Sequence, residues 1–468
     1  MIDMKVKKVA LVNPFPYYAK EYVASILPPV GLAYLAAVLR ERDIECIIID
    51  AQILRMRNDD VIKRLSNFDP DMIGLTSNIV SARACIELSK TIKEQLNKPV
   101  VIGGPYASIM VGKTLTSSGA FCIIRGEGED TVVDLINNLD SLSKVRGISY
   151  VSKGKVKHNP DRELIKNLDS LPFPAYDLLP NLKLYRSRSR RSPSAPILTS
   201  RGCPYGCIYC SKTVFGRIFR FRSAENVIKE IEMLVNDFGV KQIDILDDNF
   251  TLIRENAERV FDMIIEKKIK IAINLQSGIR VETLTQDFVK KMKRAGVFKT
   301  GIGIESGEDR ILKIIKKSSD LKKINQAIRW FRSEGIIVYG FFMIGLPYET
   351  KADVKKTIKF AKMVNPHIAN FTITTAFPDT ELYEMLQKNG ITVTPLTEYG
   401  SERGFFSAKT YYSLNSLSRE EIIEYDRKAF KSFYFRPTKV LDMLLSIKSL
   451  NELKWTIRAV FEIFKLIF

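Results

Sequence analysis

Histidine is almost absent from this chain of 468 residues, in which His158 and His367 are the only two. Neither has a second histidine or a cysteine at the spacing of a zinc finger, so a histidine-based metal site is not expected. The chain also lacks an apolar run of about 20 residues, and its start, MIDMKVKKVALVNP, passes straight from charged residues into a short strand-like run. We therefore expect a cytoplasmic protein.

A glycine-rich G-x-G-x-x-G sequence is missing after the first strand-like run, which argues against an ordinary nicotinamide or flavin dinucleotide site. The six cysteines do not suggest a disulfide framework, because three of them lie within eight residues and the others are scattered through apolar segments. We interpret the scattered ones, Cys46, Cys85 and Cys122, as small core residues and not as ligands.

The formal net charge of +19 would suit nucleic acid, an anionic membrane surface or acidic small molecules. Lysine and arginine are spread over most of the predicted helices, however, so a solvated surface is the simpler interpretation. A basic cluster at Arg186, Arg188, Arg190 and Arg191 keeps open a non-catalytic metal- or nucleic-acid-binding protein. That alternative requires stacking aromatics within the cluster, where only Tyr185 adjoins it, so a nucleic-acid partner is not expected.

Strand-like apolar runs alternate with amphipathic stretches over residues 1–140. Five such runs occur, at KKVALVNP, ECIIIDA, DMIGLTSN, PVVIGGPYA and FCIIRGEGE. Strands this apolar are covered on both faces, and helices between them make the strands parallel. The pattern predicts an α/β domain with a doubly wound, Rossmann-like sheet of five strands.

Residues 141–195 are polar and contain several prolines, and we interpret them as a connector that packs along the domain junction or covers a site. Over residues 196–380 a second alternation predicts six strands with helices between them. Six such units favour an open, partial (βα)6 version of the TIM-type barrel, because a complete barrel needs about 250 residues. Active-site residues should then lie where the strands end.

Residues 381–468 are predicted to form an α-rich C-terminal extension. Within it, residues 437–468 carry apolar side chains at helical spacing, interleaved with lysine and arginine. Such a helix either caps the open edge of the barrel or makes peripheral contact with an anionic membrane.

Cys203, Cys207 and Cys210 lie in CPYGCIYC, directly after the strand-like run ILTSR. Three thiolates are one short of a closed structural zinc site. On a cluster of four irons, three thiolates leave one iron open to bind a substrate or cofactor.

This three-cysteine spacing, with the aromatic Tyr209 before the last cysteine, resembles the signature of the radical S-adenosylmethionine (SAM) superfamily. The resemblance implies a 4Fe–4S cluster whose open iron binds the amino and carboxylate groups of SAM. It also implies reductive cleavage of SAM to methionine and a 5′-deoxyadenosyl radical, with an electron donor such as flavodoxin or ferredoxin.

Polar and glycine-containing segments end the later strand-like runs, where the same resemblance expects contacts with SAM. Glycine permits close approach of the backbone, a glutamate accepts hydrogen bonds from ribose hydroxyls, and an arginine holds a carboxylate. The residues assigned to SAM in this way are Tyr209, Asp247, Asp248, Gln276, Arg280, Gly303, Glu305, Ser306 and Gly345.

In the N-terminal domain, ligands are expected outside the carboxyl ends of the strands. The segments PPVGLAYLAAVL, TSN, VVIGGPYAS and RGEGEDT, placed ahead of the cysteines, resemble the cobalamin-binding domain of cobalamin-dependent radical enzymes. Since residues 1–140 contain no histidine, cobalamin would be bound base-off without a histidine ligand, although a domain that binds no corrinoid stays open. The residues assigned to cobalamin are Asn13, Pro14, Thr76, Ser77, Gly103, Gly104, Gly126, Glu127, Gly128 and Glu129.

The leading hypothesis is a cobalamin-dependent radical SAM methyltransferase that acts on an unactivated carbon. An oxidative cyclisation or rearrangement with the same cofactors is the alternative, and the sequence does not separate the two. The basic amphipathic tail favours a lipid-like substrate, while peptides and small metabolites stay open.

Overall fold

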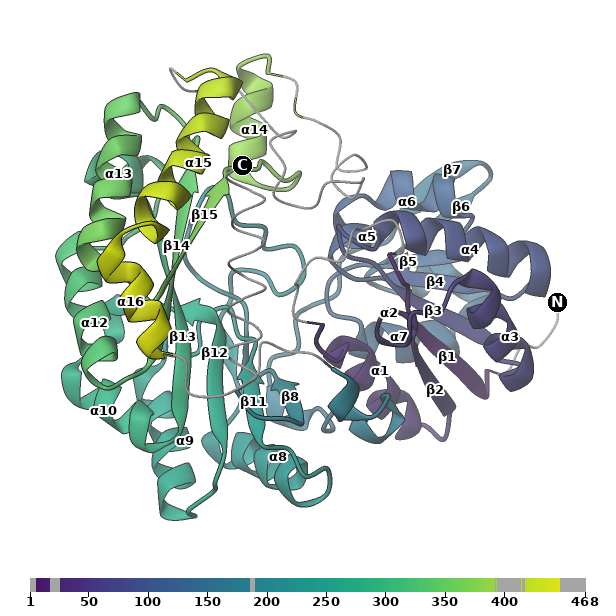
Figure 1. The fold of residues 1–468 in the computed structure, drawn as a ribbon. Coiled ribbons are helices and arrows are strands. Elements are labelled where there is room, and N and C mark those ends of the chain that lie inside the picture. The colour runs from purple at the N-terminus through teal and green to yellow at the C-terminus, as the bar shows by residue number, and fades with distance from the viewer. Residues whose placement is uncertain are drawn as a thin grey trace.

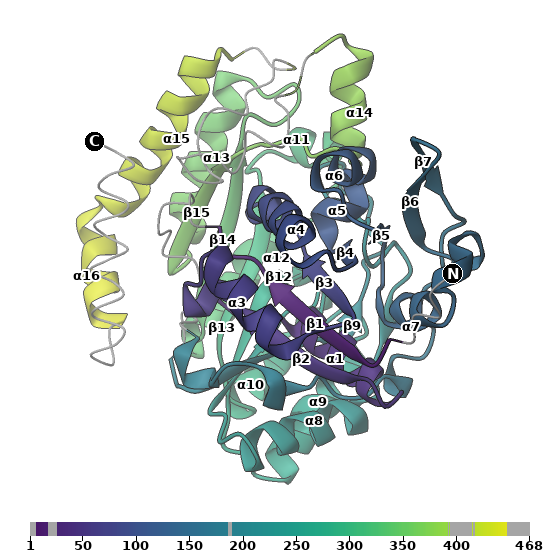
Figure 2. The ribbon, with the colours of Figure 1, turned by 90° about the vertical axis from the view of Figure 1, so that its right-hand side faces the viewer.

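The computed structural model describes residues 6–16, 26–185, 190–391, 393, 414 and 417–446. Figure 1 shows two parallel-sheet units side by side, the N-terminal unit in purple and blue and the barrel unit in teal and green. The two views in Figures 1 and 2 place the last helices on the side of the barrel away from the N-terminal unit.

The N-terminal sheet has the strand order β2-β1-β3-β4-β5-β6-β7, and its first five strands are parallel. Both faces are buried, since Val9 and Leu11 enter one apolar core while Ala10 and Val12 enter another. The doubly wound α/β fold is thereby confirmed. Its strands are β1 (Lys8–Asn13), β2 (Glu45–Asp50), β3 (Met72–Thr76), β4 (Val100–Gly103), β5 (Cys122–Ile124), β6 (Ile148–Ser152) and β7 (Lys155–His158).

The helices of this unit are α1 (Val30–Arg40), α2 (Ala51–Leu54), α3 (Asn58–Phe68), α4 (Ala82–Leu96), α5 (Pro105–Ile109), α6 (Val111–Ser118) and α7 (Glu129–Asn137). The scattered cysteines Cys46, Cys85 and Cys122 are all buried in this unit.

The number of strands differs from the expected five, because β6 and β7 extend the sheet as an antiparallel hairpin. A two-residue turn at Lys153 and Gly154, both with positive φ, joins the two strands. Their sequence is polar because the hairpin is largely exposed, and for that reason it looked like part of a connector. The chain divisions at residues 140, 195 and 380 stay predictions.

In the described residues between α7 and β8 there are four short 3-10 turns: η1 (Leu139–Lys144), η2 (Leu168–Ser170), η3 (Tyr176–Leu178) and η4 (Leu182–Leu184). Tyr185, at the end of η4, donates a 2.8 Å hydrogen bond to Asp50, which also accepts from Asn13 at 2.8 Å. This segment thus packs against the carboxyl ends of β1 and β2.

The barrel unit contains the six predicted strands in consecutive order, β8-β11-β12-β13-β14-β15, and all are parallel. The partial barrel is thereby confirmed. Its strands are β8 (Ser194–Ile197), β11 (Gln242–Ile245), β12 (Ala272–Ile279), β13 (Val297–Glu305), β14 (Ile337–Ile344) and β15 (Ile368–Ile373), with a short antiparallel pair, β9 (Ser200–Arg201) and β10 (Arg220–Phe221).

The helices of the barrel unit are α8 (Ala224–Asn236), α9 (Arg254–Glu266), α10 (Gln286–Arg294), α11 (Asp309–Ile314), α12 (Leu321–Ser333), α13 (Lys351–Val364) and α14 (Glu381–Lys388), with the 3-10 turn η5 (Val281–Thr283).

A tyrosine covers each edge strand of the open barrel. The Tyr434 hydroxyl donates to the carbonyl of Ala369 in β15 at 2.8 Å and accepts from the N–H of the same residue at 3.1 Å. On the opposite edge, the Tyr176 hydroxyl donates to the carbonyl of Pro196 in β8 at 2.7 Å.

Two C-terminal helices follow, α15 (Arg419–Tyr434) and α16 (Pro437–Ser446). Phe430 and Phe433 of α15 pack edge-to-face on Phe371 of β15, so this helix caps the open edge of the barrel. The start of α16 is docked by the buried Lys439, which donates to the Pro366 carbonyl at 2.8 Å. The remainder of the predicted tail, residues 447–468, lies outside the described residues.

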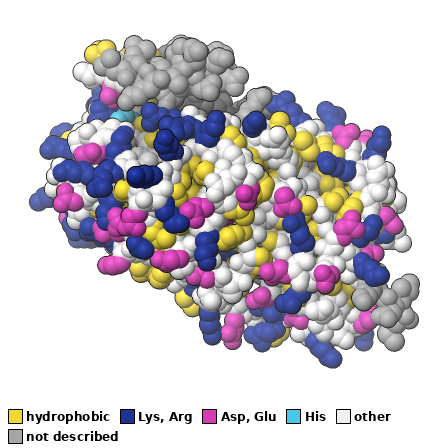
Figure 3. Space-filling view, turned by 90° about the horizontal axis from the view of Figure 1, so that it is seen from below, with side chains coloured by type: hydrophobic (Ala, Val, Ile, Leu, Met, Phe, Trp, Pro, Cys, Tyr) yellow, Lys and Arg dark blue, Asp and Glu magenta, His cyan; other side chains and the backbone are white. Residues whose placement is uncertain are grey.

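No helix in the described part of the chain is both long enough and apolar enough to cross a bilayer. On the lower face in Figure 3, dark blue Lys and Arg side chains are interspersed with magenta acidic ones. The positive charge of this face is therefore distributed over a mixed surface.

We expect His367 to make the protein less stable in mild acid. Its Nδ1 accepts a 3.1 Å hydrogen bond from the N–H of Val338, and burial, together with Arg332 and Lys439, lowers its pKa to about 4. The contribution of the neutral imidazole to the free energy of unfolding is complete above the unfolded-state pKa of about 6.5 and is lost as the pH falls towards 4. Between pH 7 and pH 5 the free energy of unfolding should therefore fall by about 2 kcal/mol.

Denaturant titrations of the parent and of H367N at these two pH values measure this loss. The asparagine can accept the same hydrogen bond but does not titrate, so its stability should fall by correspondingly less. An equal fall in both proteins would contradict the assignment.

Candidate active site

The cysteine loop, residues 203–210, leaves β9 at the carboxyl end of the first barrel strand. Asp247, which follows β11, accepts hydrogen bonds from the Thr199 N–H at 2.7 Å and from the Ser200 hydroxyl at 2.6 Å. Asp247 is buried, and burial raises its pKa to about 6. Its carboxylate therefore positions the strand that leads to Cys203, a role that sequence reasoning missed, while its contact with SAM stays a prediction.

The backbone of the loop closes tightly on the segment that follows it. Gly202 has φ of +84°, and a Cβ there would lie 2.4 Å from the carbonyl oxygen of Ile218. The Ile208 N–H donates to the carbonyl of Ile315 at 3.2 Å, which ties the loop to the end of α11. Glycine is required at 202 because no other residue fits this approach.

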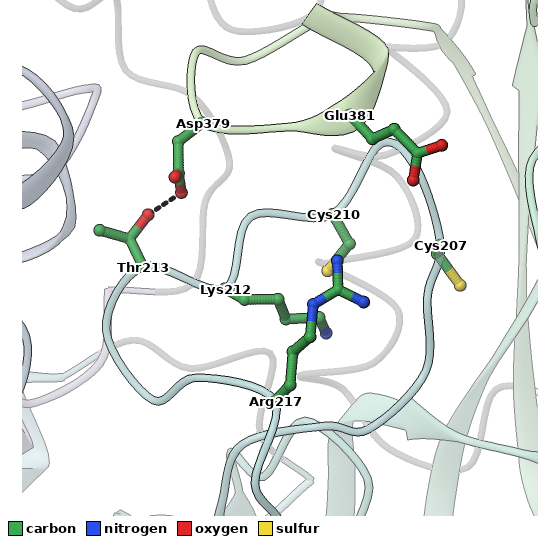
Figure 4. Close-up of a pocket in the computed structure, with 7 residues that line it drawn as sticks. All are labelled: Cys207, Cys210, Lys212, Thr213, Arg217, Asp379 and Glu381. Carbon is green, nitrogen blue, oxygen red and sulfur yellow. Dashed lines mark hydrogen bonds between the residues drawn. The ribbon is translucent and has the colours of Figure 1, made fainter. Parts of the chain in front are cut away.

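Cys203, Cys207 and Cys210 are all partly exposed. Cys207 and Cys210 line a cavity of about 240 Å³ together with Lys212, Thr213, Arg217, Asp379 and Glu381 (Figure 4). Figure 4 shows Thr213 turned towards Asp379, to which it donates a hydrogen bond. Burial raises the pKa of the Cys210 thiol, and the Lys212 ammonium opposes that rise.

The donor set fits an iron–sulfur cluster. Within the described residues no three Cys, His, Asp or Glu side chains are grouped as ligands of one metal ion. Thiolates of a 4Fe–4S cluster bind different irons, so they need not converge on one point. The residues present are three thiols on one glycine-containing loop, beside a cavity.

Two predicted SAM residues contact the cysteine loop directly or lie beside it. The guanidinium of Arg280 stacks on the ring of Tyr205, at 3.7 Å from the ring centre. The Tyr209 hydroxyl is hydrogen-bonded to the Glu305 carboxylate, and burial, followed by that carboxylate, raises the pKa of Tyr209. Glu305 also forms a 3.0 Å ion pair with Lys317 that is almost fully buried.

Other predicted SAM residues are less directly placed. Asp248 is exposed and adds to the negative charge around Lys212. A Cβ at Gly303 would lie 2.6 Å from Oε1 of Glu305, so glycine leaves room for that carboxylate. Ser306 is buried against Thr357 at 3.2 Å, and the N–H of Gly345 donates to Glu349 at 2.7 Å. The side chain of Gln276 lies outside the described residues.

The edge of the N-terminal unit at which a ligand is expected lies at the carboxyl ends of β1, β3, β4 and β5. The turn after β4 depends on Gly104, which has φ of +96°. A Cβ added at this position would lie 2.7 Å from the Ser77 carbonyl oxygen. The hydroxyl of Tyr106 is buried there without a hydrogen-bond partner among the described residues, whereas that of Ser77 pairs with the Cys85 thiol. An unpartnered hydroxyl suits a site that receives a polar ligand, so the residues present fit a corrinoid.

The remaining predicted cobalamin residues have other contacts. Asn13 donates to Asp50, Pro14 is buried, and Thr76 is half-buried beside Gly104. A Cβ at Gly128 would meet Leu35 of α1 at 3.1 Å, whereas at Gly126 the nearest atom would be the Val214 carbonyl oxygen, 3.7 Å away on the segment after the cysteines.

Glu127 and Glu129 are engaged by the barrel unit. Arg201 donates to Glu127 at 2.9 Å and to Glu129 at 2.6 Å, and Arg220 donates to Glu127 at 2.7 Å. All four side chains are at least nine-tenths buried. Arg201 and Arg220 are paired across β9 and β10, which aligns both guanidinium groups with the carboxylates. The contact of Glu127 and Glu129 with cobalamin stays a prediction.

Sequence reasoning missed this cluster of buried ion pairs, which we call the junction cluster (Glu127, Glu129, Arg201 and Arg220). Burial alone would lower the pKa of Arg201, but the two glutamates outweigh it and raise that pKa. The position of Arg201 two residues before Cys203 was a signal in the sequence, but its partners are more than seventy positions away.

Together, the fold and the cysteine loop define an iron–sulfur enzyme with a partial barrel and a second ligand-binding unit. Residues 197–361 match the radical SAM superfamily, and residues 19–136 match the B12 binding domain. An uncharacterized methyltransferase of Pyrococcus horikoshii is 36% identical over 94% of both chains. The chain belongs to the radical SAM enzymes that carry a B12-binding domain, and it is an enzyme of the cobalamin-dependent class.

Two further similarities extend the comparison. The anaerobic magnesium-protoporphyrin IX monomethyl ester cyclase of Rubrivivax gelatinosus is 25% identical over 81% of this chain and 70% of its own length. The radical SAM methyltransferase TsrM of Kitasatospora setae, solved with cobalamin and a 4Fe–4S cluster bound, has a TM-score of 0.70 at 16% identity over 92% of this chain and 90% of its own. The similarity to TsrM shows that the two proteins share a fold.

Breaking the junction cluster should be costly. We expect R201L to lower the free energy of unfolding by about 3–5 kcal/mol, because it leaves buried carboxylates without their cation. Denaturant titration monitored by circular dichroism measures the loss. Replacing Arg83, which forms an exposed pair with Glu87 within α4, by alanine is the matched control and should cost about 0.5 kcal/mol or less. Equal losses of unfolding free energy in the two variants would show that burial does not increase the contribution of the junction cluster.

Proposed function

We propose that this enzyme methylates an unactivated carbon of a small-molecule or lipid substrate. One observation carries the proposal: the junction cluster holds the cysteine loop against the edge of the N-terminal unit at which a ligand is expected. A substrate between the two units would be accessible from both. The name of the Pyrococcus horikoshii relative supports methyl transfer.

In this proposal Cys203, Cys207 and Cys210 hold the cluster and leave one iron for SAM. When bound, the cluster supplies the electron for reductive cleavage of SAM, and cobalamin supplies the methyl group. Arg280, which follows β12, braces the cysteine loop by stacking on Tyr205 of the loop, while Glu305 lies beside Tyr209 at the end of β13. The described side chains thus orient SAM and exclude water from it.

The cobalamin is proposed to be base-off and without a histidine ligand, because residues 1–140 contain no histidine. Tyr106 supplies a hydroxyl that gains a hydrogen-bond partner when the site is filled. An electron donor such as flavodoxin or ferredoxin belongs to the same proposal. Peripheral membrane contact through residues 437–468 is proposed only if the substrate is a lipid.

Oxidative cyclisation is the second candidate, favoured by the cyclase relative. The two functions are separated by the fate of a labelled methyl group. Anaerobic lysates of cells with and without the protein are incubated with trideuteromethyl-labelled SAM, and their metabolites and lipids are analysed by mass spectrometry. Methyl transfer places the label in a product that only the protein-containing sample forms, whereas a new product without label favours cyclisation.

Substitution of Cys203, Cys207 or Cys210 by alanine should abolish the cluster. Anaerobically prepared protein should carry about four irons and four sulfides per chain, and each variant should lose them, because a missing thiolate leaves a second iron open. Iron analysis and visible absorption measure the loss. C46A, C85A and C122A are the matched controls and should keep full iron. Stoichiometric zinc in the parent protein would contradict the assignment.

Gly103→Val tests the corrinoid site with little strain on the fold, since a Cβ at Gly103 would meet nothing closer than 3.8 Å. We expect the full-length variant to take up about tenfold less hydroxocobalamin, because a bulky side chain projects into the space for the corrin ring. Gel filtration followed by absorption spectroscopy measures the uptake. The Co(II) form of the parent should show no nitrogen splitting in its EPR spectrum, and nitrogen splitting would contradict a site without histidine.

A further inference from the structure

We propose that Lys212 raises the reduction potential of the cluster, and that Asp379 is a positioning residue that keeps Lys212 directed at it. The inference rests on the proposed function, since it requires a 4Fe–4S cluster on Cys203, Cys207 and Cys210. It adds two residues from outside the cysteine motif.

The Lys212 side chain reaches the thiols of the cysteine loop. Its ammonium group is hydrogen-bonded to the Cys210 thiol and also interacts electrostatically with Cys203. Figure 4 shows this side chain extending into the cavity that Cys207 and Cys210 line. Lys212 is only partly exposed, so solvent ions screen its charge less than that of a surface lysine.

Two acidic side chains near Lys212 leave its charge available to the thiols. Glu381, which lines the same cavity, forms an ion pair with Lys316 at 2.6 Å. Asp248 is exposed, and its attraction for Lys212 is weaker than that of the two nearby thiols. The positive charge of Lys212 is therefore directed at the ligands of the cluster.

Asp379 fixes the residues on both sides of Lys212. Its carboxylate accepts a 3.1 Å hydrogen bond from the Ser211 hydroxyl and another from the Thr213 hydroxyl, which Figure 4 shows. Because both neighbours are held, the backbone of Lys212 has little freedom to rotate. Its side chain thus stays directed at Cys210.

The loop that carries Asp379 is itself held on two sides. Asp379 has φ of +76°, which is uncommon for a residue other than glycine and persists where the surroundings impose it. On one side, Phe377 packs against the apolar cluster around Tyr106 of the N-terminal unit. On the other, the Thr380 hydroxyl accepts a 3.2 Å hydrogen bond from the N–H of Tyr383 in α14. Both units therefore contribute to the position of the Asp379 carboxylate.

A cation beside a ligand sulfur favours the reduced form of a cluster. One electron from a low-potential donor enters the cluster and adds one negative charge, while no bond changes and no proton is transferred. Net charge and hydrogen bonds to the sulfurs are among the factors that set the potential of such clusters. Lys212 supplies both a charge and a hydrogen bond, so it makes the cluster easier to reduce.

The test is a potentiometric titration of the full-length enzyme with its cluster, in the absence of SAM, followed by EPR of the reduced cluster. In K212M we expect the equilibrium constant for reduction to fall about tenfold, which lowers the potential by about 59 mV for one electron. K212R keeps the cation and should stay close to the parent. K63M removes an exposed lysine of α3 and is the matched control, whose potential should equal that of the parent. K212Q takes the place of K212M if K212M loses its cluster on preparation.

Two variants of Asp379 separate positioning from direct electrostatics. D379A and D379N both remove a negative charge, which by itself raises the potential, but the asparagine keeps an oxygen that accepts from the two hydroxyls. We expect the potential of D379A to lie below that of D379N, because only the alanine releases Lys212. Equal potentials in these two variants would contradict the positioning role of Asp379.

Equal potentials in the parent and in K212M would overturn the proposal. Weaker SAM binding by K212M at an unchanged potential would also overturn it, because Lys212 would then serve the SAM carboxylate. A parent protein that binds no cluster would instead defeat the proposed function, and iron analysis separates that failure from an unchanged potential.

Discussion

Four ionised side chains are buried where the two units of this enzyme meet, and the geometry of the active site depends on how they pair. Removing one such ion from water costs several kcal/mol, which only well-placed opposite charges offset. Glu127 and Glu129 follow β5, and Arg201 and Arg220 belong to the short β9–β10 pair, so neither unit satisfies its own charges. Docking is thereby restricted to arrangements in which all four ions find partners.

The restriction on docking also applies to the cysteine loop, because only a short stretch of backbone joins that loop to the junction cluster. Arg201 is separated from Cys203 by Gly202 alone, whose backbone is packed against Ile218. The ring of Phe215 and the ring of Tyr34 flank the Arg201 guanidinium, each 5.3 Å from it. Asp247 fixes the preceding residues Thr199 and Ser200. The loop is thus held in position by contacts from both units.

Much of this architecture could be predicted from the sequence because its signals are local. Apolar runs located the six barrel strands and the first five strands of the N-terminal sheet, and spacing alone singled out the three cysteines. The β6–β7 hairpin was not predicted because exposed strands are polar, and a connector has the same polar composition. The roles of Asp247 and Glu127 were not predicted because their partners are far away in the sequence. In the sequence, a glutamate beside a glycine has the same appearance whether its carboxylate faces a ligand or an arginine of another unit.

The tyrosines on the two barrel edges have a consequence for self-association. An unpaired strand edge offers its N–H and C=O groups as a template for a strand of another chain. In β15 a single phenol, that of Tyr434, occupies both backbone groups of Ala369, and in β8 Pro196 has no N–H while its carbonyl is taken by Tyr176. In this way a barrel with fewer than eight strands keeps its edges unpaired without inviting edge-to-edge aggregation.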